Sequence, residues 1–306
     1  MITKDVTWLW TNSALVCEGS GPAFLRQRLK FLMFALAAFN FVKPLMHAER
    51  GTSIGKHIAE RPETVGAAIW PYQSTAWNAR KRLTRIGEHH SVIDKIGGPL
   101  DFSVNDRLVL LDLGEIRPGL SVVVDQPKWF IREGQLTINL FLDDTRLYSL
   151  VFSLFNDNGD IAAFVGAIQG RDLDGILDEY RTLTKAAHGM RPRDFLIELF
   201  RMFCAMLGIK RIFAVADEYR QHRSPYYGKD PDRKLSVNYN EIWQDRGGTR
   251  IDSRVWQLDL NVAERDLGTV SAKKRPMYRR RYEMLKNIKQ QMLENWRRLE
   301  ESKAAI

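Results

Sequence analysis

Ile161-Ala162-Ala163-Phe164-Val165-Gly166-Ala167-Ile168 is a short apolar run bounded by turn residues, and it predicts a buried β-strand. Further on, the loop His188-Gly189-Met190-Arg191 precedes Pro192, which suits a first helical position because its missing N–H would have no helical partner there. Apolar residues then recur with helical period up to Gly208, and residues 212–216 predict the next strand. A loop bearing glycine and arginine therefore opens a helix between two strands, where backbone N–H groups and the helix dipole can hold an anion.

On the N-terminal side of this unit the pattern changes to short strands. Four β-rich runs are separated by turn residues, and their short connections predict antiparallel neighbours; they lie at 108–113, 120–124, 136–142 and 148–155. Helices are predicted at 22–42, ended by Pro44, and at 52–60, 74–96, 173–183 and 192–207. Apolar residues that recur every seven positions from Tyr278 predict a long final helix.

These elements predict an α+β fold. A helical region, residues 1–100, is expected to pack on an α+β core, residues 101–270, which consists of a mostly antiparallel sheet and the strand-loop-helix-strand crossover. Residues 271–306 are expected to form a basic helix that packs on the core, pairs with a second chain as a homo-oligomer, or lies on an anionic surface. No linker separates independent domains.

The composition favours some function classes and disfavours others. The chain has 306 residues, with 46 Lys and Arg against 37 Asp and Glu, and a formal net charge of +9 is compatible with ligands that carry phosphate, with nucleic acid or with an acidic membrane. Two cysteines alone do not predict a disulfide framework or a Cys-based zinc site, so no metal site is expected. The sequence contains none of the common P-loop, zinc-protease, hydrolase or dinucleotide-binding motifs.

The N-terminus lacks the layout of a signal peptide, so a cytoplasmic location is expected. The longest apolar run, residues 31–42, is shorter than the roughly 20 residues needed to span a bilayer. It predicts a buried core helix, and the alternative is a helix on the surface of the inner membrane flanked by basic residues. The pair His89-His90 is expected to be structural, because adjacent helical residues point about 100° apart and make an awkward ligand pair.

Four motifs together resemble the VirK/YbjX family of bacterial proteins: Gly166-Ala167-Ile168-Gln169-Gly170, Thr184 with residues 188–193, Tyr239-Asn240-Glu241-Ile242-Trp243 before Gly247-Gly248, and the basic run 273–282. In that family the third motif usually begins Tyr-Asp, so Asn240 is a departure. The resemblance implies a bacterial protein linked to virulence, to resistance against cationic antimicrobial peptides and to the cell envelope. It implies no agreed reaction.

The order of elements also resembles the acyl-CoA N-acyltransferase (GNAT) superfamily, including its branch that adds amino acids to peptidoglycan. This second resemblance implies an acyl- or aminoacyltransferase that takes its donor from acyl-CoA or aminoacyl-tRNA. By that mapping, residues 165–169 flank the pantetheine arm, and Gln169, Gly170, Gly189, Met190, Arg191 and Arg193 form the cofactor site. The helix at 173–183 and the lack of Gly-x-Gly in the loop depart from the superfamily pattern.

Transfer to an amine needs a base whose pKa lies near the working pH. His188 is a candidate by chemistry and location, although capping or bracing the helix start is the role that its position favours, and Glu133 and Tyr239 are weaker candidates.

A different class of function, a non-catalytic regulator, is the alternative. Its basic segment would contact nucleic-acid phosphates or a protein partner through Lys273, Lys274, Arg275, Arg279, Arg280 and Arg281.

Overall fold

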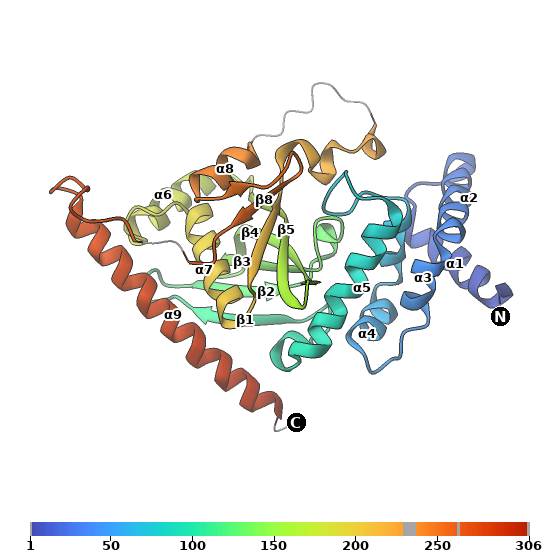
Figure 1. The fold of residues 1–306 in the computed structure, drawn as a ribbon, viewed down its shortest axis with the longest axis horizontal. Helices are drawn as coiled ribbons and strands as arrows, with labels where there is room; N and C mark the ends of the chain where they lie inside the picture. The colour runs from blue at the N-terminus through green and yellow to red at the C-terminus, as the bar shows by residue number, and fades with distance from the viewer. Residues whose placement is uncertain (1, 229–236, 262–263, 305–306) are drawn as a thin grey trace.

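The computed structural model describes residues 2–228, 237–261 and 264–304. The strands of these residues form one eight-stranded sheet in the order β1-β2-β3-β4-β5-β6-β8-β7 (Figure 1). All neighbouring strands are antiparallel except β5 and β6, which are parallel. The strands are β1 (Arg107–Asp112), β2 (Leu120–Asp125), β3 (Leu136–Leu142), β4 (Thr145–Asp157), β5 (Asp160–Gly170), β6 (Arg211–Val215), β7 (Thr249–Arg250) and β8 (Val255–Leu258).

Helices precede, interrupt and follow the sheet. Those before it are α1 (Ile2–Val16), α2 (Gly21–Ala37), α3 (Phe39–Met46), α4 (Ser53–Glu60) and α5 (Ala79–Ile96). The helices α6 (Ile176–Ala186) and α7 (Pro192–Met206) connect β5 to β6, α8 (Tyr239–Asp245) follows β6, and α9 (Arg275–Ala304) follows β8. The α+β class, the N-terminal helices, the mostly antiparallel sheet and the long C-terminal helix are therefore confirmed.

The two faces of the sheet bury different partners, because successive side chains of a strand point to opposite faces. Phe152 of β4 packs against Phe200 and Phe203 of α7, with its ring centroid 4.8 Å from that of Phe200. The next residue, Ser153, meets the Tyr72 hydroxyl from the N-terminal region at 2.7 Å. The sheet thus lies between the N-terminal helices on one side and α7 with α9 on the other (Figure 1).

In the N-terminal region, the helices begin and end at other residues than predicted. The predicted helix 22–42 is two helices, α2 and α3, which meet at 95° around Ala38. Pro44 does not end the helix but lies inside α3, whose Val42 and Leu45 are buried and offset the one backbone hydrogen bond that proline cannot make. The helix predicted from residue 74 begins only at Ala79, where the Asn78 side chain accepts the Lys81 N–H as an N-cap.

No single helix of the described residues is long and apolar enough to cross a membrane. Taken together, the helices α2 and α3 have the length and the apolar composition of a membrane span, but they are bent by 95° at the break between them.

The C-terminal helix packs on its own chain, which is the first of the three predicted arrangements. Ile288, Met292 and Trp296 of α9 are buried, and the Trp296 ring lies edge-on to Phe203 of α7. The Asn295 side chain donates to the Leu110 carbonyl of β1. Pairing with a second chain stays a prediction.

Three histidines lie together between α4, α5 and the sheet. The rings of His57 and His89 flank that of His90, with centroids 4.6 and 5.0 Å away, and all three are buried. His57 meets Thr64, His90 meets Ser53, and Nδ1 of His89 accepts the Leu154 N–H. The pair His89-His90 is therefore structural in this fold, as expected.

These histidines should make the fold sensitive to mild acid. Burial lowers the pKa of His57 and His89 well below the ordinary value, and lowers that of His90 to about 4. Below pH 6.5 the unfolded chain binds protons that the folded chain does not, so the free energy of unfolding falls as pH falls. We expect a loss of about 2 kcal/mol per histidine between pH 6.5 and 5, before most carboxylates titrate.

Urea unfolding at several pH values measures this loss. His90→Gln should flatten the pH dependence relative to the wild type, because one buried histidine fewer then takes up a proton on unfolding. A stability that is constant from pH 7 to 5 would contradict the assignment.

Candidate functional site

The candidate site lies where β5 and β6 separate. The two strands pair from Ala162 opposite Arg211 to Val165 opposite Ala214, and beyond that point β5 continues to Gly170 beside β4 alone. A bulge in the β4–β5 register falls at Gly166. A Cβ at Gly166 would lie 2.0 Å from the carbonyl oxygen of Glu133, so only glycine fits there.

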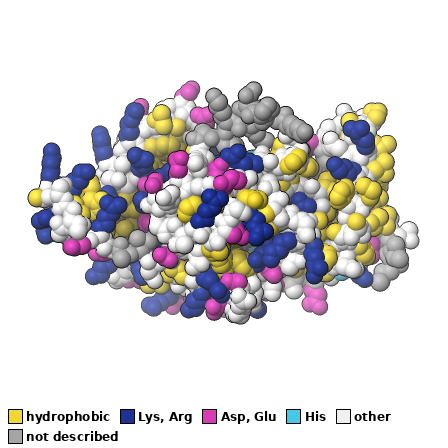
Figure 2. All heavy atoms as spheres, turned by 45° about the horizontal axis from the view of Figure 1, so that its top comes forward, with side chains coloured by type: hydrophobic (Ala, Val, Ile, Leu, Met, Phe, Trp, Pro, Cys, Tyr) yellow, Lys and Arg dark blue, Asp and Glu magenta, His cyan; other side chains and the backbone are white. Residues whose placement is uncertain are grey.

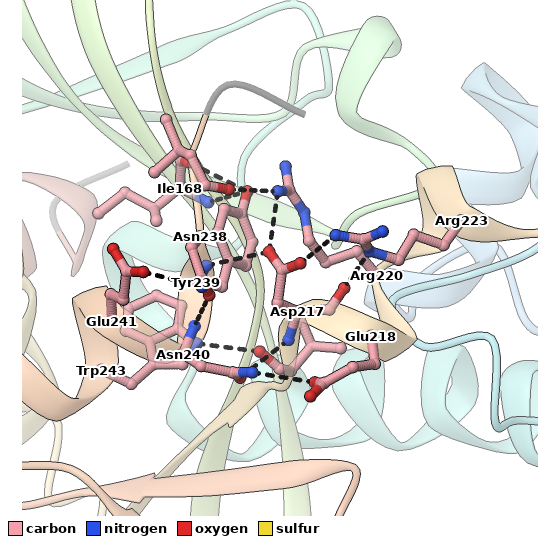
Figure 3. Close-up of polar contacts among 12 residues, drawn as sticks. Ile168, Asp217, Glu218, Arg220, Arg223, Asn238, Tyr239, Asn240, Glu241 and Trp243 are labelled. Carbon is pink, nitrogen blue, oxygen red and sulfur yellow. Dashed lines mark hydrogen bonds and ion pairs between the residues drawn. The ribbon is translucent and has the colours of Figure 1, made fainter. Parts of the chain in front are cut away.

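Tyr239, the first residue of α8, closes the gap between the diverging strands (Figure 3). Its hydroxyl accepts the Ile168 N–H at 2.9 Å and donates to the Ile168 carbonyl at 3.0 Å. Burial raises the pKa of Tyr239 to about 12, although the Arg220 guanidinium, 3.6 Å above the ring, opposes that rise. Both hydrogen-bonding functions of the hydroxyl are used by the backbone, so the tyrosine acts as a brace in this structure.

Asp217 holds α8 in place from the end of β6 (Figure 3). Its Oδ1 accepts the Tyr239 N–H at 3.0 Å and Nη1 of Arg220 at 3.3 Å, and its Oδ2 pairs with Arg223. Burial alone would raise the pKa of Asp217, but the Tyr239 N–H and the two arginines hold it below the ordinary value. The carboxylate therefore stays charged in this setting.

Asn240 has a structural role that its side-chain amide explains. Its Oδ1 accepts the Asp217 N–H at 3.0 Å and the Trp256 Nε1–H at 2.9 Å, and its Nδ2 donates to the Glu218 carboxylate at 3.0 Å. An aspartate would keep both acceptor contacts, but it would place a second carboxylate against Glu218. The amide at position 240 thus avoids a second carboxylate beside Glu218.

Glu133 and His222 form a buried acid–imidazole pair on the other side of the bulge. Oε1 of Glu133 lies 2.6 Å from Nε2 of His222, and it also accepts from Nε2 of Gln221 at 3.2 Å. The Glu133 side chain is 4% exposed, whereas that of His222 is 30% exposed and reaches solvent. Among the described residues, Oε2 of Glu133 has no hydrogen-bond partner. A buried carboxylate with one oxygen unpaired is costly for stability and is typical of a chemical role.

Aromatic side chains flank this pair. The Arg132 guanidinium lies 4.9 Å from the centre of a Trp70 ring and 5.2 Å from that of Tyr226, and its Nη1 donates to the Tyr227 hydroxyl at 3.2 Å. The Tyr227 ring centroid is 6.0 Å from that of His222. The polar, aromatic segment after β6 is therefore packed around the Glu133–His222 pair.

The predicted base His188 lies in a different place, against α9. It adopts a positive φ of 49° after α6, and its carbonyl accepts from Nε and Nη2 of Arg281 at 3.1 and 2.8 Å. With Arg280 and Glu283 it lines a cleft of about 610 Å³. Burial lowers its pKa, and the charges of Arg280 and Arg281 lower it further. Of the three predicted catalytic residues, the structure places Glu133 and Tyr239 beside the strand gap and His188 on the α9 side.

The predicted phosphate residues are already engaged in local contacts. The Gly189 N–H donates to the Thr184 carbonyl at 2.7 Å, and the Met190 N–H donates to the Ala187 carbonyl at 3.1 Å. Nε of Arg193 donates to Asp194, whereas Arg191 is exposed. This conformation leaves Arg191 as the group best placed to meet an anion.

The other two predicted cofactor residues, Gln169 and Gly170, are the last two residues of β5. Gln169 is partly exposed and pairs with Ser149 of β4. Gly170 lies against two tyrosines, because a Cβ there would come within 2.7 Å of Tyr148 and Tyr180. Their cofactor roles stay predictions.

His222 and Gln221 were not predicted as site residues. The available signal was a histidine in a turn-rich segment directly after a buried strand, where functional loops gather. Its partner Glu133 is distant in sequence, so the pair is visible only in three dimensions.

Within the described residues, the fold and the site define an α+β protein with a mixed eight-stranded sheet and a pair of buried Glu133 and partly exposed His222 beside the parallel junction of β5 and β6. The chain belongs to the family described as "Protein of unknown function (DUF535)", whose model matches residues 23–294. The uncharacterized protein YbjX of Escherichia coli is 28% identical over 232 residues, which cover 72% of this chain and 68% of that protein. An uncharacterized protein of Haemophilus influenzae is 32% identical over 219 residues, 68% of this chain and 69% of that protein. No solved structure matches the chain.

Asp217 should stabilise the fold through its pairs with Arg220 and Arg223. Asp217→Asn removes the charge that balances Arg220 and Arg223 and should destabilise the fold by about 2–4 kcal/mol, because the arginines are left without their counter-charge in a largely buried setting. Asp252→Asn is the matched control, since its pair with Arg254 is exposed and should contribute little. Denaturant unfolding compares the two, and equal effects would show that Asp217 is not a structural anchor.

Proposed function

We propose that this protein is an acyl- or aminoacyltransferase that uses Glu133 and His222 to activate its acceptor, in keeping with a role in modifying the cell envelope. The observation that carries the proposal is the 2.6 Å contact between the buried Glu133 carboxylate and the solvent-reaching His222 ring. The antiparallel strands followed by one parallel pair, with helices in the connection, also support it, because this order is similar to that of the acyl-CoA N-acyltransferase superfamily.

The pair has the parts of an acid–base device. Glu133 faces Nε2 of His222, so it can hold that nitrogen as N–H. Nδ1 lies 3.0 Å from Nε2 of Gln221, and it takes a proton from the acceptor amine when the acceptor replaces that amide contact. As the proton leaves, the amine nitrogen forms its bond to the acyl carbon, and the donor's leaving group departs with the electron pair of the broken bond. Glu133 stabilises the imidazolium that results.

The contacts around the strand gap restrict which donor can bind. Acyl-CoA does not fit in the mode that the sequence predicts, because Tyr239 uses the Ile168 backbone and the turn before α7 uses the Gly189 and Met190 N–H groups. We therefore derive no step through CoA, and an aminoacyl donor is the favoured class. The exposed Lys273, Lys274, Arg279 and Arg280 at the start of α9 are compatible with a donor carried on RNA.

A test of the base compares single-turnover transfer by the wild type with that of Glu133→Gln and His222→Gln. Charged tRNA and acetyl-CoA serve as donors, with bacterial envelope fractions as acceptor. Each variant should lose about 10²–10⁴-fold in rate, the usual contribution of a positioned base, while its thermal unfolding stays close to that of the wild type. Glu301→Gln, an exposed carboxylate on α9, is the control and should keep the wild-type rate. Full activity in both pair variants would exclude the pair as the base.

Calorimetry distinguishes the donors. Binding of acetyl-CoA that Arg191→Ala weakens would restore acyl-CoA as the donor, whereas absence of binding to the wild type would leave the aminoacyl class. Native mass spectrometry of protein purified from its host would show directly whether tRNA, CoA or lipid accompanies it.

A non-catalytic regulator that binds nucleic acid is the second candidate, and the four exposed basic residues of the α9 start favour it. Arg275 and Arg281 contribute less, because Arg275 donates to the Val270 carbonyl and Arg281 to that of His188. Filter binding across a salt series would show affinity that falls steeply with salt if this candidate holds. Affinity that is absent or independent of salt would argue against it.

A further inference from the structure

Helix α2 presents large apolar side chains to solvent. Leu25, Leu29, Met33 and Leu36 are 48%, 53%, 61% and 41% exposed. At 100° per residue they form one strip along the helix, about 140° around it from the face that buries Phe31 and Ala35. Figure 2 shows hydrophobic side chains gathered at the end of the molecule that the N-terminal helices form. An exposed apolar patch of this kind marks an interaction surface.

The charges around this strip have one sign. Residues 19–48 contain no Asp or Glu. Arg26 and Lys30 are exposed one helical position beyond the strip, and Nζ of Lys30 lies 6.0 Å from the centre of the Phe34 ring. Arg28, in contrast, points inward and donates to the Ser13 hydroxyl and the Trp10 carbonyl at 2.7 Å. The apolar strip and the two basic residues beside it, Arg26 and Lys30, make the exposed face of α2 amphipathic.

We infer that this face of α2, formed by Leu25, Leu29, Met33 and Leu36 with Arg26 and Lys30, docks on the surface of an anionic lipid bilayer. The strip enters the boundary between headgroups and acyl chains, and the two bases meet lipid phosphates. A lipid surface matches the charges better than a second copy, because a symmetric dimer through this face would bring like charges together.

This docking surface involves none of the residues assigned to group transfer. It therefore stands whether or not the Glu133–His222 pair proves to be a base. It would place the protein at the membrane through the N-terminal helices and leave α9 packed on its own core.

Co-sedimentation of the full chain with lipid vesicles tests the inference. Phosphatidylcholine vesicles that contain phosphatidylglycerol should bind at least about tenfold more protein than phosphatidylcholine alone, and salt should weaken that binding. Leu29→Glu/Met33→Glu should reduce the binding at least about tenfold, and Arg26→Glu/Lys30→Glu should remove the preference for the anionic lipid. Leu173→Glu/Leu177→Glu is the matched control, since these leucines are 44% and 64% exposed beside and on α6, and it should bind as the wild type does.

Light scattering after size-exclusion chromatography tests the alternative that a second copy of the chain binds this face of α2. A dimer that Leu29→Glu/Met33→Glu dissociates, in a protein that binds neither kind of vesicle, would overturn the inference. Equal loss of vesicle binding in the α6 control would overturn it as well, because the effect would then not belong to α2.

Discussion

The Tyr239 hydroxyl holds the sheet together at the point where β5 leaves β6. Buried backbone N–H and C=O groups must be paired, and the departure of β6 after Val165 would leave those of Ile168 without partners. One phenol supplies both a donor and an acceptor, which no aliphatic side chain could do. The position of α8, the packing of Arg220 on the ring and the closure of the strand gap all depend on these two hydrogen bonds.

Around this brace the charges are matched, and at Glu133 they are not. Asp217 balances Arg220 and Arg223, and Asn240 connects Asp217, Trp256 and Glu218 through an amide that serves as both donor and acceptor. Glu133 is equally buried, but one of its oxygens lacks a hydrogen-bond partner within the described chain. The balanced charges around Asp217 stabilise the contact between the end of β6 and α8. The second arrangement, at Glu133, retains a buried carboxylate with one unpaired oxygen beside a partly exposed imidazole, which is the setting expected of a reactive centre.

The elements that were predicted well have a local signal. The runs that became β3, β5 and α7 show a clear period and end at turn residues, so their bounds fall within a few residues of the prediction. The helix α1 was not predicted. The elements α8, β7 and β8 were missed because they are short, and their structure depends on partners such as Val215 and Asp217 that are distant in sequence. The break at Ala38 was missed because no proline or glycine marks it. In the candidate site, Glu133 and Tyr239 were predicted as loop and motif positions, but the contact that joins Glu133 to His222 spans 89 residues.

The sequence by itself determined the α+β class, most of the longer helices and strands, the basic balance and the family, because periodicity, turn residues and motifs are properties of neighbouring positions. Only the tertiary structure decided which strands run parallel, which side chain completes the gap at Ile168 and which histidine meets a carboxylate. Those features arise where distant segments must pair their buried polar groups with one another, and no local pattern records that pairing. The apolar strip of α2 lies between the two cases: its residues are plain in the sequence, but the burial of Phe31 and Ala35 decides which side of the helix faces out.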